Sequence, residues 1–402
     1  MRALVLDGDS RAALSIVRSL GKHGVYVIVA SEDENSLAGY SRWCSEKVIY
    51  PCPRATPKLF QGWLISILAT MPDAVLYTAS DVTTSIAGKC RLSLPAAART
   101  LLPPQRSLEI TLDKSSTLDL AHNLDIPVPQ SVEFHSGELV DVGRASFLYP
   151  MAIKSSQSDT PYRFSTAYAS NPNELRLVLK EMLKESPSAL VQEVIPGEGT
   201  AIFALCDSGK PVVTFAHRRL MEKPPWGGVS VLSQSIDPPP DTLNHALRLL
   251  TELRWHGVAM VEFKRNAHGV PCLMEINPRF WGSVELAVRS GADFPYLAFQ
   301  LASGEAIEPP RTRCAVNRWV LGEVDSATTA LTSGVPGQLR VINFLSHFWG
   351  LRHGLCCEVE RLSDLRPAVY EHATWLRASA KRVSSRLKGD PLGCEKLTAP
   401  RG

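Results

Sequence analysis

The stretch that most constrains the fold is residues 258–282, which read VAMVEFKRNAHGVPCLMEINPRFWG. Two apolar runs, residues 258–263 and 271–276, flank a turn-rich segment. Apolar runs on either side of a short polar segment are typical of a β-hairpin. Each run carries one acid, Glu262 in the first and Glu275 in the second. The sequence therefore predicts two antiparallel strands that each hold a carboxylate among apolar side chains.

The length of the loop decides where the two acids lie relative to each other. A two-residue turn at residues 268–269 would place Glu262 directly opposite Glu275. A four-residue loop at residues 266–269 would make them diagonal neighbours on the same face, and a three-residue loop would separate them. The first two loops predict a pair of neighbouring carboxylates.

A bound cation would stabilise such a pair. Two like charges across a strand pair repel, and a carboxylate among buried apolar residues is costly without a partner. Asn277 lies on the same strand face as Glu275, and Arg279 follows on that face if the chain stays extended through Pro278. Two carboxylates and an amide oxygen suit Mg²⁺, and an arginine beside them suits a phosphate. The alternative is that both acids face solvent on an edge hairpin.

These residues carry a resemblance to a known family. Glu262, followed by residues 275–279 (EINPR), resembles the metal-binding end of the ATP-grasp superfamily of ATP-dependent carboxylate-amine ligases, relatives of biotin carboxylase and carbamoyl phosphate synthase. Residues 280–283 (FWGS) resemble a subgroup of uncharacterised ligases within it. The resemblance implies that the two acids and Asn277 hold Mg²⁺ or Mn²⁺, and that Arg279 lies beside the phosphates of ATP.

Composition excludes several other classes of protein. The 402 residues suffice for two or three domains. With 43 basic and 40 acidic residues, the formal charge of +3 predicts neither a nucleic-acid nor a membrane partner. Nine cysteines without a C-x-x-C pair argue against a zinc site or a disulfide framework and fit a reducing cytosol. The apolar N-terminal run is broken by Asp7 and Asp9, so we expect a cytoplasmic enzyme without a signal peptide.

The N-terminal pattern is that of a Rossmann-like half. A strand at residues 2–7, a helical pattern that ends at Gly21 and a strand at residues 25–29 follow one another. This order also suits a nicotinamide-dependent oxidoreductase, but Gly8 is alone and the G-x-G-x-x-G motif is absent. ATP-grasp enzymes commonly begin with a degenerate Rossmann-like domain. Residues 80–83 could contact substrate at the end of a further strand or cap a helix.

The predicted fold class is α/β, with an α+β ATP-grasp fold of two subdomains after the Rossmann-like domain. The expected domains are residues 1–106 (Rossmann-like), 107–308 (ATP-grasp, with a flexible lid at about 140–195) and 309–402, a mixed or helical extension. The resemblance fades near residue 308. A basic stretch at residues 377–388 predicts a solvated helix or tail, not a membrane anchor.

Two lysines match the phosphate-binding lysines of the superfamily. Lys114 precedes a helical segment and an I-P-x-P strand, and Lys154 ends the apolar run at residues 147–154. By the resemblance, both reach phosphates of ATP. Without it, Lys114 is an exposed lysine at a helix start, and Lys154 is a strand-end lysine that reaches solvent. The next residues, 155–159 (SSQSD), lack the glycines that usually let a flap close over the triphosphate, which puts turnover in question.

Residues 189–199 resemble the segment that contacts adenine in ATP-grasp enzymes. On that template Glu193, Val194 and Ile195 meet the base, and Glu198 binds the ribose hydroxyls. The alternative is a strand that leaves into a Pro-Gly turn, which explains the backbone but not the two acids.

A basic cluster follows at the end of another predicted strand. His217, Arg218 or Arg219 could stabilise negative charge on the transferring phosphoryl group. Strand alternation lets only two of the three share a face. The alternative is a solvated strand end followed by a flexible loop.

The resemblance implies a Mg²⁺-dependent ligase that activates a substrate carboxylate with ATP as an acylphosphate and joins it to an amine. The expected partners are a small-molecule carboxylate and amine, and a homodimer is left open. Two alternatives within the superfamily are a protein that makes another bond, by carboxylation or as a thioester, and a nucleotide-binding protein with little turnover. The sequence names neither the acid nor the amine.

Overall fold

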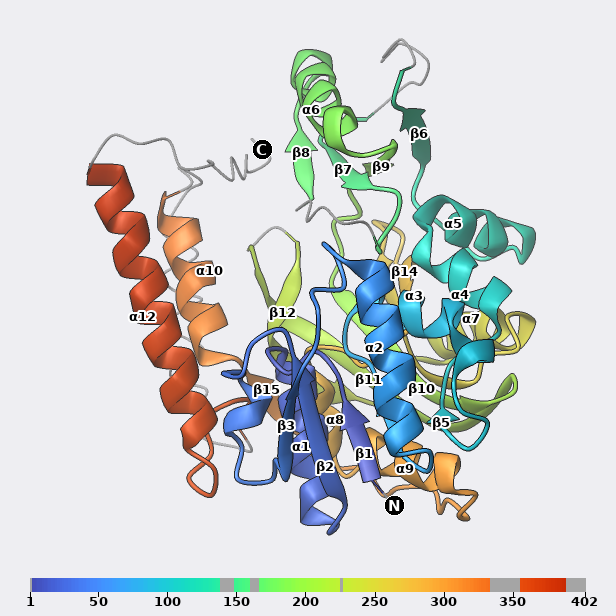
Figure 1. Ribbon diagram of the computed structural model, residues 1–402. Coiled ribbons are helices and arrows are strands. Elements are labelled where there is room, and N and C mark those ends of the chain that lie inside the picture. The colour runs from blue at the N-terminus through green and yellow to red at the C-terminus, as the bar shows by residue number, and fades with distance from the viewer. Residues whose placement is uncertain (1, 138–147, 160–165, 225–226, 333–354, 388–402) are drawn as a thin grey trace.

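The computed structural model describes residues 2–137, 148–159, 166–224, 227–332 and 355–387 (Figure 1). They form sheets of five, seven and four strands, with helices packed on them. The predicted α/β class, with a Rossmann-like sheet ahead of two further sheets, is confirmed. Within the described residues, no helix has the length and apolar character that crossing a membrane requires.

The N-terminal sheet is parallel throughout, with strand order β3-β2-β1-β4-β5. Its elements are β1 (Arg2–Val5), α1 (Arg11–Lys22), β2 (Tyr26–Ser31), β3 (Glu46–Ile49), α2 (Pro57–Thr70), β4 (Val75–Tyr77), α3 (Asp81–Lys89) and β5 (Arg99–Thr100). The central strands are almost continuously apolar because both faces of a parallel sheet are covered. The α1 helix begins after Ser10, whose hydroxyl accepts a hydrogen bond from the Ala13 N–H at 3.0 Å. The predicted strand–helix–strand unit is therefore confirmed.

The carboxyl ends of β1 and β4 adjoin, and Asp7 joins the residues that follow them. Its backbone has a φ of 59°. The Asp7 carboxylate accepts hydrogen bonds from the Ala79 N–H (2.8 Å) and from the hydroxyls of Ser80 (2.9 Å) and Thr83 (2.7 Å). Ser80 also caps α3 by accepting from the Thr83 N–H. This network fixes the first residue of α3, Asp81, at the end of the sheet.

The second sheet has the strand order β14-β13-β10-β11-β12-β15-β16. Its strands are β10 (Gly199–Asp207), β11 (Lys210–Lys223), β12 (Val229–Ile236), β13 (Gly257–Arg265), β14 (Pro271–Asn277), β15 (Val316–Arg318) and β16 (Leu355–Cys357). Successive side chains face opposite sides. Ile202 and Ala204 join a core with residues of α7 (Pro240–Glu252). Phe203 and Leu205 join the core shared with the N-terminal sheet, α8 (Val284–Ser290) and α9 (Phe294–Ser303).

A smaller unit, here called the lid, stands above the two larger sheets (Figure 1). It comprises the four-stranded sheet β6-β9-β7-β8 and one helix, and two short helices lead into it. The bounds are α4 (Gln105–Leu112), α5 (Lys114–Asn123), β6 (Ser131–His135), β7 (Met151–Ser155), β8 (Ala167–Ala169), α6 (Pro172–Glu185) and β9 (Ser188–Glu193). The sequence predicted a lid at about 140–195, and the described part of this unit within that range is residues 148–159 and 166–193.

The C-terminal residues complete the larger sheet and add two helices, α10 (Val320–Thr332) and α12 (Arg366–Leu387). β15 pairs with β12, and β16 pairs with β15, so part of the predicted extension belongs to the second sheet. Buried ion pairs connect the segment after β16 to helices far back in the chain. Arg18 of α1 pairs with Asp364 at 2.8 Å, and Arg361 pairs with Glu285 of α8.

Candidate functional site

A cavity of about 500 Å³, here called the central cavity, lies between the lid, the second sheet and the N-terminal domain. Its walls carry side chains from β7, β9, β11, β13 and β14, together with Asp81 at the start of α3. Most residues proposed from the sequence reach this cavity, and two do not.

The hairpin of β13 and β14 brings the two acids together, but with a loop and a register that differ from those predicted from the sequence. Its loop has three residues, 267–269, closed by a bond from the Asn266 N–H to the Val270 carbonyl at 3.0 Å. Gly269 has a φ of +77°, as this type of loop requires. The two- and four-residue loops that favoured the pairing are therefore wrong. A bulge shifts the register between Glu262 and the next residue, so that Glu262 still pairs with Glu275.

Asn277 bridges the two carboxylates. Its amide nitrogen donates to Glu262 Oε1 at 3.3 Å and to Glu275 Oε1 at 3.1 Å. Its Oδ1 accepts a bond from Arg279 at 3.0 Å. The three predicted metal ligands are therefore adjacent, but the amide oxygen of Asn277 faces Arg279, and the amide must turn over before that oxygen can join the carboxylates.

The two facing acids have different electrostatic environments. Burial raises the pKa of Glu262, although Arg219 beside it opposes the effect. Burial also acts to raise the pKa of Glu275, but Lys114 and Lys154 outweigh it, so the net pKa is lowered. Glu275 therefore holds its charge more strongly than Glu262, and the charges that lower its pKa most are those of the two lysines predicted to bind phosphates.

Arg219 reaches the central cavity, and Arg218 does not. Arg219 forms an ion pair with Glu262 and donates to Glu222 Oε1 at 3.0 Å. Arg218 is on the opposite face of β11, where it donates to Gln234 Oε1 at 3.0 and 2.8 Å. This follows from strand alternation, which lets only one of two successive residues face the cavity.

His217 shares the cavity face of β11 with Arg219, as expected for residues two apart in a strand. It is fully buried, and burial together with the charge of Arg219 lowers its pKa well below the ordinary value, so the ring is neutral. Its Nδ1 lies 3.3 Å from the Ser283 hydroxyl. Ser283, which precedes α8, makes no side-chain capping bond to that helix.

Arg279 is held by an acid that the sequence interpretation did not include among the site residues. Its guanidinium donates to Asp81 Oδ1 at 2.8 Å and to Oδ2 at 3.4 Å. The signal was present, because Asp81 belongs to the polar group at residues 80–83 that follows an apolar strand. The bidentate pair connects the N-terminal domain to the end of the hairpin.

The two lysines and the predicted adenine segment line the same cavity. Lys114 donates to the Ser158 hydroxyl at 3.0 Å, and Lys154 donates to Gln192 Oε1 at 3.0 Å. The adenine segment, Glu193, Val194 and Ile195, follows Gln192 along the wall. The wall of the central cavity therefore carries two cations close to the chain segment that leaves β9.

Glu198, the predicted ribose ligand, lies outside the central cavity. Its side chain is 49% exposed and is 4.0 Å from Arg218. Glu222, an acid not singled out from the sequence, does line the cavity, where it contacts Arg219 and lies 3.9 Å from Lys264. No local pattern in the sequence pointed to Glu222. It lies beyond the basic cluster, in a part of β11 that was not predicted to belong to the strand.

The glycine-poor flap contacts the N-terminal domain. Asp159 accepts a bond from the Ser85 hydroxyl at 2.6 Å and one from Lys89 at 3.4 Å, and both donors belong to α3. The Ser158 N–H donates to the Leu112 carbonyl at 2.9 Å. Hydroxyl, carboxylate and backbone contacts therefore hold the flap where the superfamily usually has glycines.

The donor set fits a hard divalent cation that brings further oxygen ligands. Among the described residues, no group of three or more His, Cys, Asp or Glu side chains forms a metal site by itself. Glu262 and Glu275 supply carboxylate oxygens within reach of one amide group. Mg²⁺ accepts few protein ligands and completes its coordination with phosphates and water, which suits such a pair.

Comparison with known proteins agrees with this geometry. No curated protein matches the chain. Residues 185–320 match the family described as "ATP-grasp in the biosynthetic pathway with Ter operon". Similar solved structures include the L-amino acid ligase from Bacillus licheniformis, at 16% identity over 79% of this chain and 79% of that chain, with a TM-score of 0.62.

Two further structures have comparable similarity. A biotin carboxylase–β-γ-ATP complex from Campylobacter jejuni is 13% identical over 78% of this chain and 74% of that chain, with a TM-score of 0.62. The N5-carboxyaminoimidazole ribonucleotide synthetase from Thermus thermophilus is 18% identical over 78% of this chain and 82% of that chain, with a TM-score of 0.60. The chain therefore has the ATP-grasp fold, and the resemblance stated from the sequence is confirmed.

Proposed function

We propose that the protein is an ATP-dependent ligase that activates a small-molecule carboxylate as an acylphosphate and joins it to an amine, with release of ADP and phosphate. The observation that carries the proposal is the facing pair of Glu262 and Glu275 in a cavity that also presents Lys154, Arg219 and Arg279. Carboxylates for a divalent cation beside three cationic side chains make a suitable receptor for a triphosphate.

The position of each residue in the cavity suggests its role. Glu193, Val194 and Ile195 would receive the adenine, and Lys114 and Lys154 would contact the phosphates. Glu262 and Glu275 would hold Mg²⁺, which neutralises charge on the terminal phosphates when it is bound. Arg219, which pairs with Glu262 and lines the same cavity, would stabilise negative charge on the transferring phosphoryl group.

Arg279 is suited to orient the substrate carboxylate. Asp81 and Asn277 fix its guanidinium from two sides, so little rotational freedom is lost when a carboxylate binds. The substrate oxygen attacks the γ-phosphorus, the bond to the β-phosphate oxygen breaks, and ADP leaves. The amine then attacks the acyl carbon, loses a proton and displaces phosphate. His217, which lies beside Ser283, is neutral and adds no positive charge to the central cavity.

Hydroxylamine trapping across a library of carboxylic acids, with ATP and Mg²⁺, tests this proposal. Hydroxylamine captures an acylphosphate as a hydroxamate, so the activated acid is identified without knowledge of the amine. The expected result is hydroxamate formation that matches ADP release for one class of acid. ATP binding without ADP or hydroxamate from any acid would replace the proposal with a nucleotide-binding role. Once the acid is known, comparing amines with thiols as acceptors separates amide from thioester formation.

A further inference from the structure

The flap at residues 155–159 forms part of the wall of the central cavity, and its last residue contacts a neighbouring helix. Ser158 lines the cavity, whereas Asp159 does not. The Asp159 carboxylate instead reaches α3 of the N-terminal domain, where its Oδ2 accepts hydrogen bonds from the Ser85 hydroxyl at 2.6 Å and from the Lys89 ammonium at 3.4 Å. This contact, here called the latch, connects the flap to the N-terminal domain outside the space that a ligand would occupy.

The bond to Ser85 is the stronger part of the latch. Ser85 is 2% exposed, whereas the side chain of Lys89 is 59% exposed. An exposed ion pair contributes little in water, but a hydroxyl that donates to a carboxylate makes a charge-assisted bond. A buried hydroxyl also costs free energy when its acceptor is lost. The bond between Ser85 and Asp159 therefore favours the docked position of the flap.

The latch lies on the same face of α3 as the acid that holds Arg279. Asp81, Ser85 and Lys89 follow one another at intervals of four residues, which places them on one side of the helix. Asp81 pairs with Arg279 at 2.8 Å. One face of α3 therefore contacts the arginine beside the hairpin and, further along the helix, the end of the flap.

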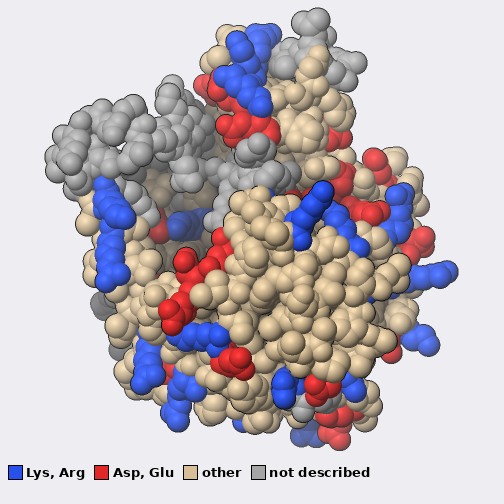
Figure 2. All heavy atoms as spheres, viewed as in Figure 1, with Lys and Arg blue, Asp and Glu red and all other residues tan. Residues whose placement is uncertain are grey.

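The helices α3 and α4 form one platform beneath the lid. Figure 1 shows them side by side below the four-stranded sheet. Gly88 of α3 lies so close to α4 that a Cβ atom at this position would overlap the Leu108 side chain. Figure 2 shows the lid as a projection from the rest of the molecule. Contacts with the platform at the base of this projection therefore determine whether the flap is docked.

Backbone hydrogen bonds hold the flap through an isolated bridge to residues 112–114. The Ser158 N–H donates to the Leu112 carbonyl at 2.9 Å, and the Lys114 N–H donates to the Ser156 carbonyl at 2.8 Å. A bridge of this kind outside a sheet is weak by itself, because ordering several residues costs more conformational entropy than so few bonds offset. The latch adds a further attachment, on a different helix.

A docked flap also orients one of the candidate phosphate ligands. The Lys114 Nζ donates to the Ser158 hydroxyl at 3.0 Å, and both residues line the central cavity. An ammonium group has three donors, so the other two can bind phosphate oxygens while Ser158 holds the third. If the flap leaves the platform, Lys114 loses this orientation. A nucleotide must then order both the flap and the lysine when it binds, which weakens its affinity.

We propose that Asp159 and Ser85 are positioning residues for ATP, because their bond keeps the flap docked where it covers the nucleotide phosphates. The flap lacks the glycines that usually permit closure, and a side-chain bond to the N-terminal domain holds it closed instead. The apparent affinity for a nucleotide falls with the fraction of molecules whose flap is docked. The identity of the ligand as ATP rests on the proposed function, whereas the docking of the flap does not.

Hydrogen exchange of the full chain without nucleotide tests the docking. Asp159→Ala removes the acceptor of the latch, and Ser85→Ala removes its donor. Exchange in peptides that contain the Lys114 and Ser158 amides should be about tenfold faster in both variants, the factor that one charge-assisted hydrogen bond supplies. Exchange as slow as in the wild type in both variants overturns the proposal.

Calorimetric titration with Mg²⁺ and the β,γ-methylene analogue of ATP tests the role in binding. Each variant should bind the analogue about tenfold more weakly than the wild type. The double variant should lose no more affinity than either single variant, because both substitutions remove the same bond. A contact with a purely structural role would lower the free energy of unfolding and leave this affinity unchanged. Unchanged affinity, or losses that multiply in the double variant, overturns the proposal.

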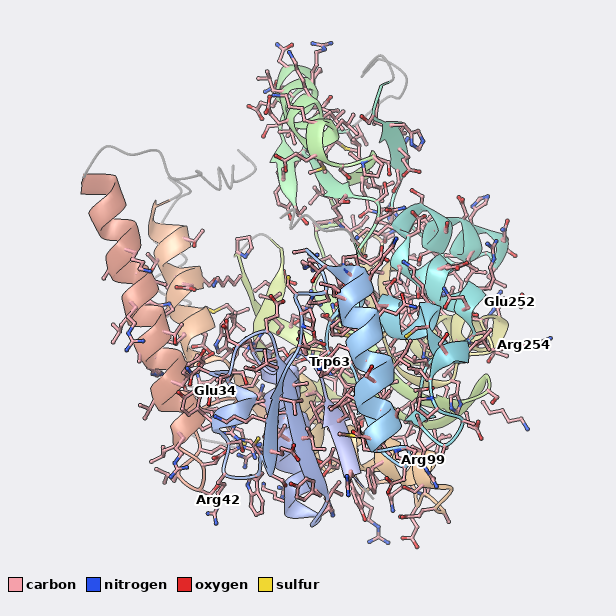
Figure 3. The ribbon with its side chains drawn as sticks, in the orientation of Figure 1. Glu34, Arg42, Trp63, Arg99, Glu252 and Arg254 are labelled. Carbon is pink, nitrogen blue, oxygen red and sulfur yellow. The ribbon has the colours of Figure 1, made fainter. Side chains whose placement is uncertain are left out.

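Two control variants match these substitutions. Asp119→Ala changes an exposed acid on α5, and Ser66→Ala changes an exposed serine on α2, the helix that carries Trp63 in Figure 3. Both should exchange hydrogen and bind the analogue as the wild type does. A tenfold loss of affinity in either control rejects the assignment to the latch.

The outcome is separable from that of the proposed function. Hydrogen exchange is measured without nucleotide, so it reports on the docking of the flap alone. Hydroxamate formation by the wild type, with unchanged exchange and affinity in the variants, rejects the latch and leaves the ligase in place. Faster exchange in the variants, with no binding of the analogue by the wild type, rejects the proposed function and with it the role of the latch in holding ATP.

Discussion

The buried carboxylate of Glu358 should make stability fall as pH rises toward neutrality. Glu358 is 2% exposed, its Oε1 has no hydrogen-bond partner among the described residues, and its other oxygen pairs with Arg11. Burial raises its pKa from the ordinary 4.5 to about 7, against the opposing charge of Arg11. The folded protein therefore binds a proton more tightly than the unfolded chain does.

The sign and size follow from proton linkage. Between about pH 4.5 and 7 the folded state holds more protons at this site, so the free energy of unfolding decreases as pH rises. Each pKa unit is worth about 1.36 kcal/mol, which gives about 3 kcal/mol for the whole window. Glu358→Gln removes the titrating group and keeps an acceptor for Arg11. Between about pH 4.5 and 7, the free energy of unfolding of Glu358→Gln should therefore decrease by about 3 kcal/mol less than that of the wild type.

Urea unfolding at several pH values across this window measures the difference. Other buried acids titrate in both proteins, so the comparison of the two slopes isolates Glu358. Glu252→Gln, which changes an exposed acid on α7, serves as the matched control and should follow the wild-type curve. If the wild type and Glu358→Gln lose stability in parallel, the reasoning that places the charge in a buried and poorly compensated position is refuted.

Three further predictions concern the site and the lid. Glu275→Gln should abolish Mg²⁺-dependent ADP release while the free energy of unfolding stays near that of the wild type, because the amide keeps the shape of the side chain but not its charge. Asp81→Asn should lower kcat about 10- to 100-fold, since it removes the charge that orients Arg279. Asn171→Ala should cost about 1 kcal/mol of lid stability, measured by hydrogen exchange in α6, because Asn171 accepts two bonds from that helix's N-terminus.

Each of these has a control and a result that contradicts it. Unchanged ADP release in Glu275→Gln would remove that residue from the metal site. For Asp81→Asn, the exposed Asp73→Asn in the same domain should retain full activity, and equal kcat in both variants would show that Arg279 needs no orienting acid. For the lid, the control is Lys180→Ala on the exposed side of α6. Hydrogen exchange in α6 of this variant should be as slow as in the wild type. Equal protection in Asn171→Ala would exclude the capping role.

The fold could be predicted from the sequence where a local pattern determines it. Alternating strand and helix patterns at the N-terminus predicted the parallel sheet. The two apolar runs that carry the acids at residues 262 and 275 predicted the hairpin. The pairing itself depended on a bulge in β14, which has no signature in the sequence and which compensated for a loop of unexpected length. The pairing of the two acids therefore came out as predicted for a reason that local residues do not reveal.

Other parts of the site depend on contacts between distant residues. Arg218 and Arg219 are adjacent in sequence, and only the pairing of β11 with β10 and β12 decides which one faces the central cavity. Asp81 lies 198 residues before its partner Arg279. β15 and β16 are three residues long, too short for an alternating pattern, so their place in the second sheet appears only in three dimensions.

The pairing of Arg18 with Asp364 has a consequence for how the molecule is made. The two residues are 346 positions apart, and both side chains are almost completely buried. During synthesis α1 leaves the ribosome early, before Asp364, the partner of Arg18, has been translated. A buried charge without its partner is strongly destabilising. The first domain to emerge therefore reaches its final stability only when nearly the whole polypeptide has been synthesised, and chains terminated early are natural targets for chaperones and proteases.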